Sequence, residues 1–266
     1  MITGASSGIG KATAKLFQRK GWNVVATMRD PSKEEELNEL ENVFVTRLDV
    51  TDAASIRTAV AAGIDRFGNI GVLLNNAGYG AYGPLEATPI DKIRQQFETN
   101  VIGLLETTKA VLPTFRARRE GVIINVSSIG GRLTFPLGTL YHGTKFAVEG
   151  LSEALSFEMA AIGVKVKIVE PGQVKTNFGG RSFDFSNDES LVEYQEMIGK
   201  LFAGFAPLTE NASDAEAVAE VIYRAATDGT NQLRYVAGKD AETLLAKRKA
   251  EDDDTFLQGI RNLFAL

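Results

Sequence analysis

Residues 3–10 read Thr3-Gly4-Ala5-Ser6-Ser7-Gly8-Ile9-Gly10, and a helical pattern over Ile9–Lys20 follows directly. Glycine allows a tight turn and lets backbone amides approach a pyrophosphate without a Cβ in the way. Amide groups at the start of the following helix then point toward the phosphates. The stretch predicts a phosphate-binding turn, although its spacing differs from G-x-G-x-x-G and also fits a strand-to-helix turn with no ligand.

A phosphate-binding turn should follow a β-strand, but only Met1 and Ile2 precede Thr3. Two residues are too few for a central strand of ordinary length. We therefore expect that the native chain has residues before Met1 that this numbering leaves out.

Short apolar runs alternate with longer helical patterns along the chain. Strands are predicted over Trp22–Met28, Val43–Leu48, Val72–Asn75, Val122–Val126 and Val164–Glu170, and helices over Ile9–Lys20, Ala53–Phe67, Ile90–Ala117 and Thr139–Ala161. The strands are continuous apolar runs, as expected where both faces of a sheet are covered. This order predicts an α/β fold with a Rossmann-like, doubly wound parallel sheet flanked by helices on both faces, in a single domain over residues 1–266.

The chain is less regular after Glu170. A segment at about 178–212 is predicted to be a substrate-binding loop or lid, because it is long and rich in phenylalanine (Phe178, Phe183, Phe185, Phe202 and Phe205). The end of the chain begins with Asp252-Asp253-Asp254 and continues with apolar residues at helical spacing. It predicts an N-capped amphipathic helix at about 252–265 that packs on its own domain, with a partner-docking helix as the alternative.

Composition excludes several classes of function. The 266 residues include no cysteine and one histidine, His142, and the net charge is -5. Disulfides, thiolate metal sites and histidine-rich metal sites are therefore excluded, and no metal is expected. Nothing resembles a basic nucleic-acid-binding face, a signal peptide or an apolar run of roughly 18 residues that could span a membrane. We expect a cytoplasmic protein.

Tyr141 and Lys145 lie four residues apart in a predicted helix, and Ser128 precedes them. Residues at i and i+4 share one helix face, so the phenol and the ammonium can reach one site. A neighbouring cation favours the phenolate, and we expect it to lower the pKa of Tyr141 toward working pH. Such a tyrosine can exchange a proton with an alcohol or carbonyl oxygen.

The cofactor preference is predicted from the end of the second strand, which reads Met28-Arg29-Asp30. Met28 offers no carboxylate for the ribose hydroxyls of NAD, whereas Arg29 can pair with the 2′-phosphate of NADP. Asp30 leaves NAD open, and Arg29 is also compatible with a solvated surface residue. NADP is the predicted cofactor, with NAD as the alternative.

Taken together, these motifs resemble the short-chain dehydrogenases/reductases from Thr3 to about Thr176. The glycine run, Asn75-Asn76-Ala77-Gly78, Asn100, Ser128, Tyr141-x-x-x-Lys145 and Pro171-Gly172 occur in the order seen in that family. The stretches Ala26–Pro31 and Tyr141–Ala147 are most similar to its hydroxysteroid and retinol dehydrogenase branch.

The resemblance implies a role for each matching residue. Tyr141 would be the general acid or base, Lys145 would lower its pKa, Ser128 would donate to the substrate oxygen, and Asn100 would hold a water that links Lys145 to solvent. Besides Tyr141, Lys145 and Arg29, the implied cofactor-binding residues are Gly4, Ser6, Ser7, Gly8, Ile9, Gly10, Asp49, Val50, Asn76, Ala77, Gly78, Pro171, Gly172, Val174 and Thr176. Two long helices, over Ile90–Ala117 and Thr139–Ala161, would pair in a homodimer or homotetramer.

Four residues also fit simpler interpretations. Asp49 could cap the next helix, and Ser127 should face away from the cofactor because successive strand residues alternate. His142 is adjacent to Tyr141 and should point elsewhere on the helix, in a packing or surface role. Asn100 is a poor residue for a helix interior, which suggests a local kink, although a surface asparagine is also possible.

The predicted function is an NADP(H)-dependent oxidoreductase that interconverts a hydrophobic ketone or aldehyde and its alcohol. Phe135, Leu137 and the segment from Phe178 to Phe205 would make the substrate pocket apolar, unless they only pack the lid. The alternative is a nicotinamide-nucleotide-binding regulatory protein without turnover. The presence of Asn100, Ser128, Tyr141 and Lys145 together favours the enzyme.

Overall fold

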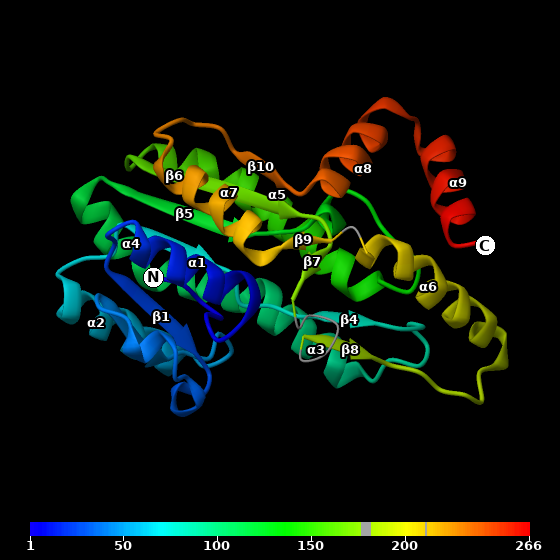
Figure 1. The fold of residues 1–266 in the computed structure, drawn as a ribbon, viewed down its shortest axis with the longest axis horizontal. Coiled ribbons are helices and arrows are strands. Elements are labelled where there is room, and N and C mark those ends of the chain that lie inside the picture. The colour runs from blue at the N-terminus through cyan, green and yellow to red at the C-terminus, as the bar shows by residue number, and fades with distance from the viewer. Residues whose placement is uncertain (177–181, 211) are drawn as a thin grey trace.

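A parallel β-sheet forms the centre of the protein (Figure 1). The computed structural model describes residues 1–176, 182–210 and 212–266. In spatial order the sheet contains β2 (Val43–Arg47), β1 (Val24–Met28), β3 (Val72–Asn75), β5 (Gly121–Val126), β6 (Val164–Pro171) and β10 (Arg234–Ala237), all parallel where they pair. From the centre of the sheet, successive strands of the chain are added toward one edge and then toward the other, as in a doubly wound fold. β10 was not predicted from the sequence.

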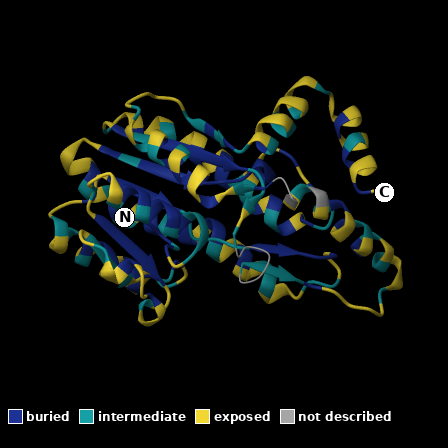
Figure 2. Cartoon of the chain, viewed as in Figure 1, coloured by how far each residue is buried: buried dark blue, intermediate teal, exposed yellow. Residues whose placement is uncertain are grey.

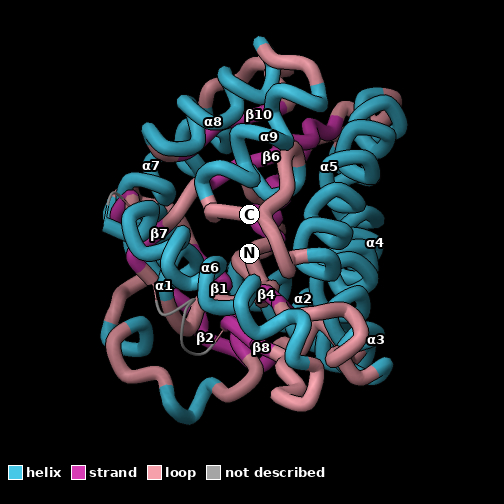
Figure 3. The backbone as a smooth tube through the Cα atoms, turned by 90° about the vertical axis from the view of Figure 1, so that its right-hand side faces the viewer, coloured by secondary structure: helices cyan, strands magenta, loops and turns pink. Residues whose placement is uncertain are grey.

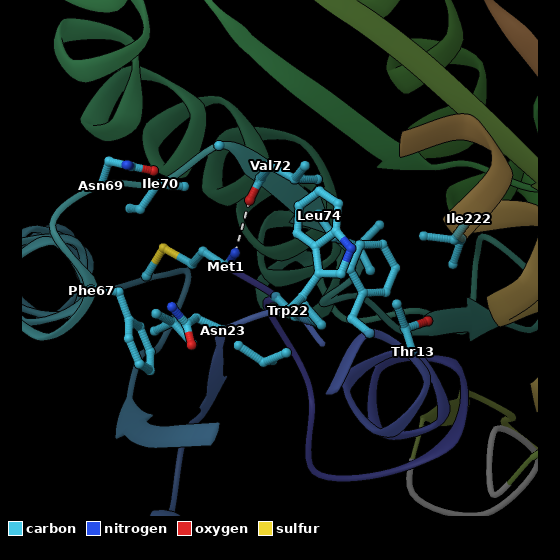
Figure 4. Close-up of a pocket in the computed structure, with 15 residues that line it drawn as sticks. Met1, Thr13, Trp22, Asn23, Phe67, Asn69, Ile70, Val72, Leu74 and Ile222 are labelled. Atoms are coloured by element: carbon cyan, nitrogen blue, oxygen red, sulfur yellow. Dashed lines mark hydrogen bonds between the residues drawn. The ribbon is translucent and has the colours of Figure 1, made fainter. Parts of the chain in front are cut away.

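The first two residues connect the two halves of the sheet. Ile2 forms parallel bridges with Ala26 in β1 and Leu74 in β3. The amino group of Met1 donates a hydrogen bond of 2.8 Å to the carbonyl oxygen of Val72, and its burial lowers its pKa to about 5 (Figure 4). A cavity of about 230 Å³, partly lined by Trp22, lies beside Met1. Backbone hydrogen bonds to β1 and β3, among them those from Ile2 to Val25 and from Thr3 to Leu74, thus hold these residues in the central strand position.

Helices cover both faces of the sheet. α1 (Gly8–Arg19) and α7 (Ala215–Thr227) pack on one face, and α2 (Ala53–Phe67), α4 (Gly103–Arg118) and α5 (Thr139–Ala160) pack on the other. Figure 3 shows α1 and α7 on one side of the strands and α4 and α5 on the opposite side. The sheet strands are largely buried between these layers (Figure 2). Covering on both faces explains why the strands are continuous apolar runs, and it confirms the predicted α/β fold.

The helix predicted over Ile90–Ala117 is interrupted. It consists of α3 (Ile90–Phe97) and α4, joined by a π-helical turn at Glu98–Ile102 that contains Asn100. A π-turn inside a helix is rare and often marks a functional site. The local irregularity that the sequence predicted at Asn100 is therefore present.

A second group of elements, most of it from the chain beyond β6, lies at the carboxyl ends of the sheet strands. Two short pairs of parallel strands, β4 (Gly80–Tyr82) with β8 (Phe183–Phe185) and β7 (Val174–Lys175) with β9 (Ser213–Asp214), lie beside α6 (Val192–Glu210), α8 (Lys239–Ala250) and α9 (Asp253–Leu263). Asp252 caps α9 by accepting a hydrogen bond from the amide of Thr255, as predicted for the helix at 252–265.

No helix within the described ranges is both long and apolar enough to cross a membrane.

The interpretation of residues 178–212 as a loop was wrong for most of that segment. It contains β8 and the 19-residue helix α6, while Phe178 lies outside the described residues. Gly199, Gly204 and Pro207 are unfavourable in helix interiors and obscured the helical spacing of Ile198, Leu201 and Phe205. Packing outweighs that propensity: a Cβ on Gly204 would lie 2.4 Å from the ring of Phe264, so glycine permits close contact between α6 and the C-terminal segment.

Candidate active site

A cavity of about 930 Å³ opens at the carboxyl ends of the sheet strands, where ligands bind in doubly wound folds. The sequence-predicted residues that line it are Gly4, Ser6, Ser7, Gly8, Ile9, Arg29, Asp49, Val50, Asn76, Ala77, Gly78, Ser128, Tyr141, Lys145, Pro171, Gly172, Val174 and Thr176. Gly10 and Asn100 lie outside this lining. The structure therefore brings together residues that are up to 172 positions apart in the chain.

The glycine turn has the backbone that its sequence predicts. Gly4 and Gly8 have positive φ angles of 67° and 53°, which other residues rarely adopt. A Cβ on Gly10 would lie 2.4 Å from the carbonyl oxygen of Gly4 and 2.6 Å from the amide nitrogen Nδ2 of Asn76. Gly10 therefore supports the turn from behind, which explains why it does not face the cavity.

Asn76 and Thr3 fasten this turn to the end of β3. Asn76 Nδ2 donates to the carbonyl oxygens of Thr3 and Gly4 at 3.0 and 3.1 Å. In return, the hydroxyl of Thr3 accepts hydrogen bonds of 3.0 Å from the amides of Asn76 and Ala77. These four bonds hold the turn rigid before any ligand is bound.

The groups at the outer end of the cavity carry distinct charges. The exposed guanidinium of Arg29 lines the cavity and has no ion pair with the residues that the structure describes. Asp30 is turned to Lys33, 2.8 Å away, and this ion pair together with Ser32 lowers its pKa to about 2. Asp49 accepts from the amide and hydroxyl of Thr51, whereas Asp52 caps α2, so the capping interpretation of Asp49 was wrong.

The half-buried side chain of Tyr141 lies beside Ser128. Burial raises the pKa of Tyr141 above its ordinary value, while a hydrogen bond with the Ser128 hydroxyl acts in the opposite direction. The sequence-based expectation of a lowered pKa was therefore wrong for this structure, because it counted the neighbouring cation and not the loss of solvent. A raised pKa keeps the phenol protonated at neutral pH.

Lys145 is close to this phenol, as the i, i+4 spacing predicts. Its ammonium nitrogen Nζ lies 5.8 Å from the centre of the Tyr141 ring and donates a hydrogen bond of 2.9 Å to the carbonyl oxygen of Val126. Burial lowers the pKa of Lys145 to about 8, and the carboxylate of Glu149 opposes that shift. The ammonium therefore stays largely charged at neutral pH.

Asn100 acts on the backbone next to the site. Its side chain donates to the carbonyl oxygen of Tyr79 at 2.8 Å and accepts from the Tyr79 amide at 3.1 Å. A further bond of 3.1 Å reaches the hydroxyl of Thr144. These contacts hold the loop after β3 against α5, and the water-holding role implied by the family resemblance stays a prediction.

His142 has the packing role that the sequence favoured, but the expectation that it points elsewhere was wrong: it lines the same cavity as Tyr141, with the two ring centres 5.6 Å apart. Its ring bridges the carbonyl oxygen of Gly130 and the amide of Phe135, both at 2.9 Å. Burial lowers the pKa of His142 to about 4, so Nδ1 donates to Gly130 and Nε2 accepts from Phe135 in a neutral ring. The ring thereby holds the segment between Ser128 and Tyr141 in place. Ser127 is buried as well and also lines the cavity, against the expectation that it faces away from it.

Sequence reasoning missed several residues of the site. Asp240 in α8 accepts a hydrogen bond of 2.7 Å from the amide of Gln173, and a Cβ on Gly172 would lie within 2.2 Å of its carboxylate. Asp240 thus holds the loop after β6 from a helix in the C-terminal part of the chain. Tyr82 also lines the cavity near Tyr141 and was not predicted. Phe205, in the phenylalanine-rich segment that the sequence placed at the substrate pocket, does line the cavity, whereas Leu137 does not.

Comparisons with known proteins agree with this geometry. A family model described as short chain dehydrogenase matches residues 1–187. The chain is 48% identical over 239 residues to an uncharacterised oxidoreductase of Schizosaccharomyces pombe, covering 90% of this chain and 100% of the relative. It is 35% identical over 271 residues to a 3-ketodihydrosphingosine reductase of Bacteroides thetaiotaomicron, covering 99% and 96% of the two chains.

Solved structures give the same result. A short-chain dehydrogenase from Streptomyces avermitilis superposes with a TM-score of 0.83 at 35% identity, covering 94% of this chain and 90% of the other. The structure of ElxO with NADP bound superposes with a TM-score of 0.75 at 28% identity, covering 91% and 97%. The similarity thus extends well beyond the part matched by the family model.

Proposed function

The chain belongs to the short-chain dehydrogenase/reductase family, and from that premise we propose that it is an NADP(H)-dependent oxidoreductase. Its reaction interconverts a hydrophobic ketone or aldehyde and the corresponding alcohol by hydride transfer. The observation that carries the proposal is the grouping of Ser128, Tyr141 and Lys145 in one cavity with the glycine turn. The first three provide a proton and a hydrogen-bond donor, and the turn provides a place for a dinucleotide.

The residues at the outer end of the cavity suit NADP. Gly4, Gly8 and the first amides of α1 form a cradle in which a Cβ on Gly8 would approach the side chain of Thr176 to 3.1 Å. Arg29 supplies a cation for a 2′-phosphate, and the ion pair of Asp30 with Lys33 leaves Arg29 available. The bound cofactor would supply the hydride, and the protein would orient it against the substrate.

The phenol of Tyr141 would give its proton to the substrate oxygen during reduction. Burial keeps this phenol protonated at neutral pH. The nearby ammonium of Lys145 stabilises the phenolate that remains after proton transfer, since opposite charges attract strongly where solvent is excluded. The Ser128 hydroxyl is placed to donate a second hydrogen bond to the same oxygen as negative charge develops on it.

The substrate end of the cavity favours an apolar molecule. Tyr82, Phe135, Phe183, Phe202 and Phe205 line this end. A lining of this kind binds hydrophobic groups, while a few polar groups fix the reacting atoms. The relative described as a 3-ketodihydrosphingosine reductase, by its name, reduces a ketone, which agrees with the proposed direction.

We also infer that two copies pair through α3, α4 and α5. Phe97 in α3 and Phe146 and Phe157 in α5 are large apolar side chains that remain exposed in the single chain. Exposed apolar residues gathered on neighbouring helices often mark an interface between subunits. Sedimentation of the wild type and of Phe157→Glu tests this: the variant should shift toward monomer, and an unchanged mass distribution would contradict the pairing.

The direct test of the reaction is a substrate panel with both cofactors. Purified protein is mixed with apolar ketones and with NADPH carrying deuterium at the transferable position, and the product alcohol is analysed by mass spectrometry. We expect NADPH consumption and one deuterium on the carbinol carbon. Binding of NADPH without turnover of any ketone or aldehyde would instead support a regulatory nucleotide-binding protein.

A further inference from the structure

Beyond Tyr141, the wall of the cavity becomes aromatic. Tyr82 lies in β4, Phe183 lies in β8, and Phe202 and Phe205 lie in α6, yet all four line the same cavity as Tyr141. We call these four residues the aromatic wall. They come from other elements than Arg29 and the glycine turn, and Tyr82 connects them to Tyr141, so they would border the space that a dinucleotide leaves for a substrate.

The rings form a continuous path that starts at the proton donor. The ring centre of Tyr82 lies 5.6 Å from that of Tyr141 and 5.4 Å from that of Phe183. Behind the wall, Phe185 stacks on Phe183 at 6.1 Å and contacts Phe202 at 5.1 Å. Phe205 contacts Tyr82 edge-on at 6.2 Å and closes the path on another side.

This path ends at the protein surface. Phe202 lines the cavity although its side chain is 49% exposed, so the cavity reaches solvent at this ring. Asp184, half-buried in β8, also lines the cavity, and its carboxylate is paired with the ammonium of Lys92 at 2.6 Å. The four rings of the wall therefore present mainly carbon surface, and the carboxylate between them is already neutralised.

We propose that the aromatic wall binds an unbranched hydrocarbon tail of the substrate, with the reacting carbonyl at Tyr141 and the tail leaving the cavity past Phe202. This inference rests on the proposed function, because it assigns the carbonyl to the same site. The planes of the lining rings turn by 33° from Tyr141 to Tyr82, by 33° from Tyr82 to Phe183 and by 80° from Tyr82 to Phe205. A flexible chain follows these turns by rotation about single bonds, whereas a rigid fused-ring substrate cannot.

Chain length is the variable that tests the proposal. Each methylene group that leaves water for the wall should raise kcat/KM by roughly fourfold at most, given the usual free energy of burying a methylene. The increase should stop once the tail passes Phe202, because further methylenes stay in water. The first experiment measures kcat/KM with NADPH for a series of straight-chain methyl ketones of increasing length, each below its aggregation concentration.

A matched pair of variants locates the end of the tail. Phe202→Ser should flatten the increase for the longest ketones, so that the ratio of kcat/KM between the longest and the shortest ketone falls. The control is Leu257→Ser in α9, which lies in the same part of the molecule with a similar exposure of 41% but does not line the cavity. The control should behave like the wild type with every ketone.

A binding experiment separates this proposal from the reaction itself. Straight-chain alcohols of increasing length are titrated calorimetrically into the NADP⁺-loaded Tyr141→Phe variant, and their affinity should rise with length as kcat/KM does. Equal affinity for short and long alcohols, or equal loss with Phe202→Ser and Leu257→Ser, would overturn the tail site even if short ketones are reduced. Rising affinity without any ketone turnover would support the tail site and contradict the proposed function.

Discussion

The end of the cavity around the glycine turn is held by hydrogen bonds, whereas the end around Phe183 and Phe205 is held by ring packing. At the first end, the amide of Asn76 and the hydroxyl of Thr3 satisfy particular backbone groups, and a Cβ on Gly10 would collide with the carbonyl oxygen of Gly4. At the second end, Phe205 contacts Phe135 and Phe264 at 5.6 and 5.3 Å between ring centres.

The two ends therefore differ in how specific their residues must be. Positions at the first end require one residue type, whereas positions at the second end require only an apolar side chain of suitable volume. A hydrogen bond requires a donor and an acceptor at fixed positions, so few residues can replace Asn76 or Gly10. An apolar wall accepts many combinations of similar volume. We therefore expect substitutions at the two ends to have separable effects: those at the first end should weaken cofactor binding, and those at the second should change stability and substrate choice.

The largest effect is expected for Phe264→Ala. This side chain is fully buried among Phe135, Phe205 and Gly204, so its truncation should lower the free energy of unfolding by about 3–5 kcal/mol. The change is measured by urea denaturation. Leu266→Ala, at an exposed position of the same segment, should change stability by only about 0.5 kcal/mol. If the folded Phe264→Ala protein bound NADPH much more weakly than the wild type, the two ends of the cavity would not be separable.

Gly10→Ala should damage the other end. The added Cβ would lie 2.4 Å from a backbone oxygen of the glycine turn, which has to move, and NADPH should bind about a hundredfold more weakly. Fluorescence titration of NADPH measures this. Gly150→Ala is the control, because a Cβ there meets no atom within 4 Å and the helical position favours alanine. Equal affinities for the two variants would remove the rigid turn from the account.

Arg29→Ala tests which group at the cofactor end selects NADPH over NADH. Loss of a charge-assisted bond to the 2′-phosphate should weaken NADPH binding about tenfold and leave NADH binding unchanged. Arg57→Ala, an exposed arginine of α2 outside the cavity lining, should change neither affinity. Titrations of both nucleotides into the three proteins decide the matter, and an unchanged preference in Arg29→Ala would show that another group selects the cofactor.

The smallest effect should come from Glu149→Gln. Lys145 has a pKa of about 8, and Glu149 raises it against the effect of burial. Reduction should therefore slow as pH rises through about 8, because the ammonium loses its proton, and this decline should move to lower pH in the variant. Glu153→Gln is the control: Glu153 also pairs with Arg234, at 2.6 Å, but is not among the groups that shift Lys145. Coincident pH profiles of kcat/KM would exclude the link.

The sequence was informative where a backbone position or a bond demands one residue type. The parallel sheet with helices on both faces follows from the alternating apolar runs, and Ser128, Tyr141 and Lys145 were predicted to share a site that the fold brings together. The direction of the Tyr141 pKa shift was wrong because burial depends on the whole fold. The sequence around Tyr141 shows the neighbouring Lys145, but it does not show the distant elements that exclude water from the phenol and raise its pKa.

The sequence was least informative in the C-terminal part. Helix α6 was not predicted because its glycines and proline lower helix propensity, while the contact of Gly204 with Phe264 that favours it involves residues 60 positions apart. Asp240 was missed for the same reason: its partner, the amide of Gln173, lies 67 positions away. Neither pairing leaves a local pattern, so only the folded structure reveals it.

The central claim is that Tyr141 transfers the proton in a ketone reduction driven by NADPH. The most direct measurement compares kcat for a straight-chain ketone and the dissociation constant of NADPH in the wild type and in Tyr141→Phe. We predict that kcat falls by at least about a hundredfold, as expected for loss of a general acid, while NADPH binds with nearly unchanged affinity. Retention of full turnover by Tyr141→Phe would contradict the account.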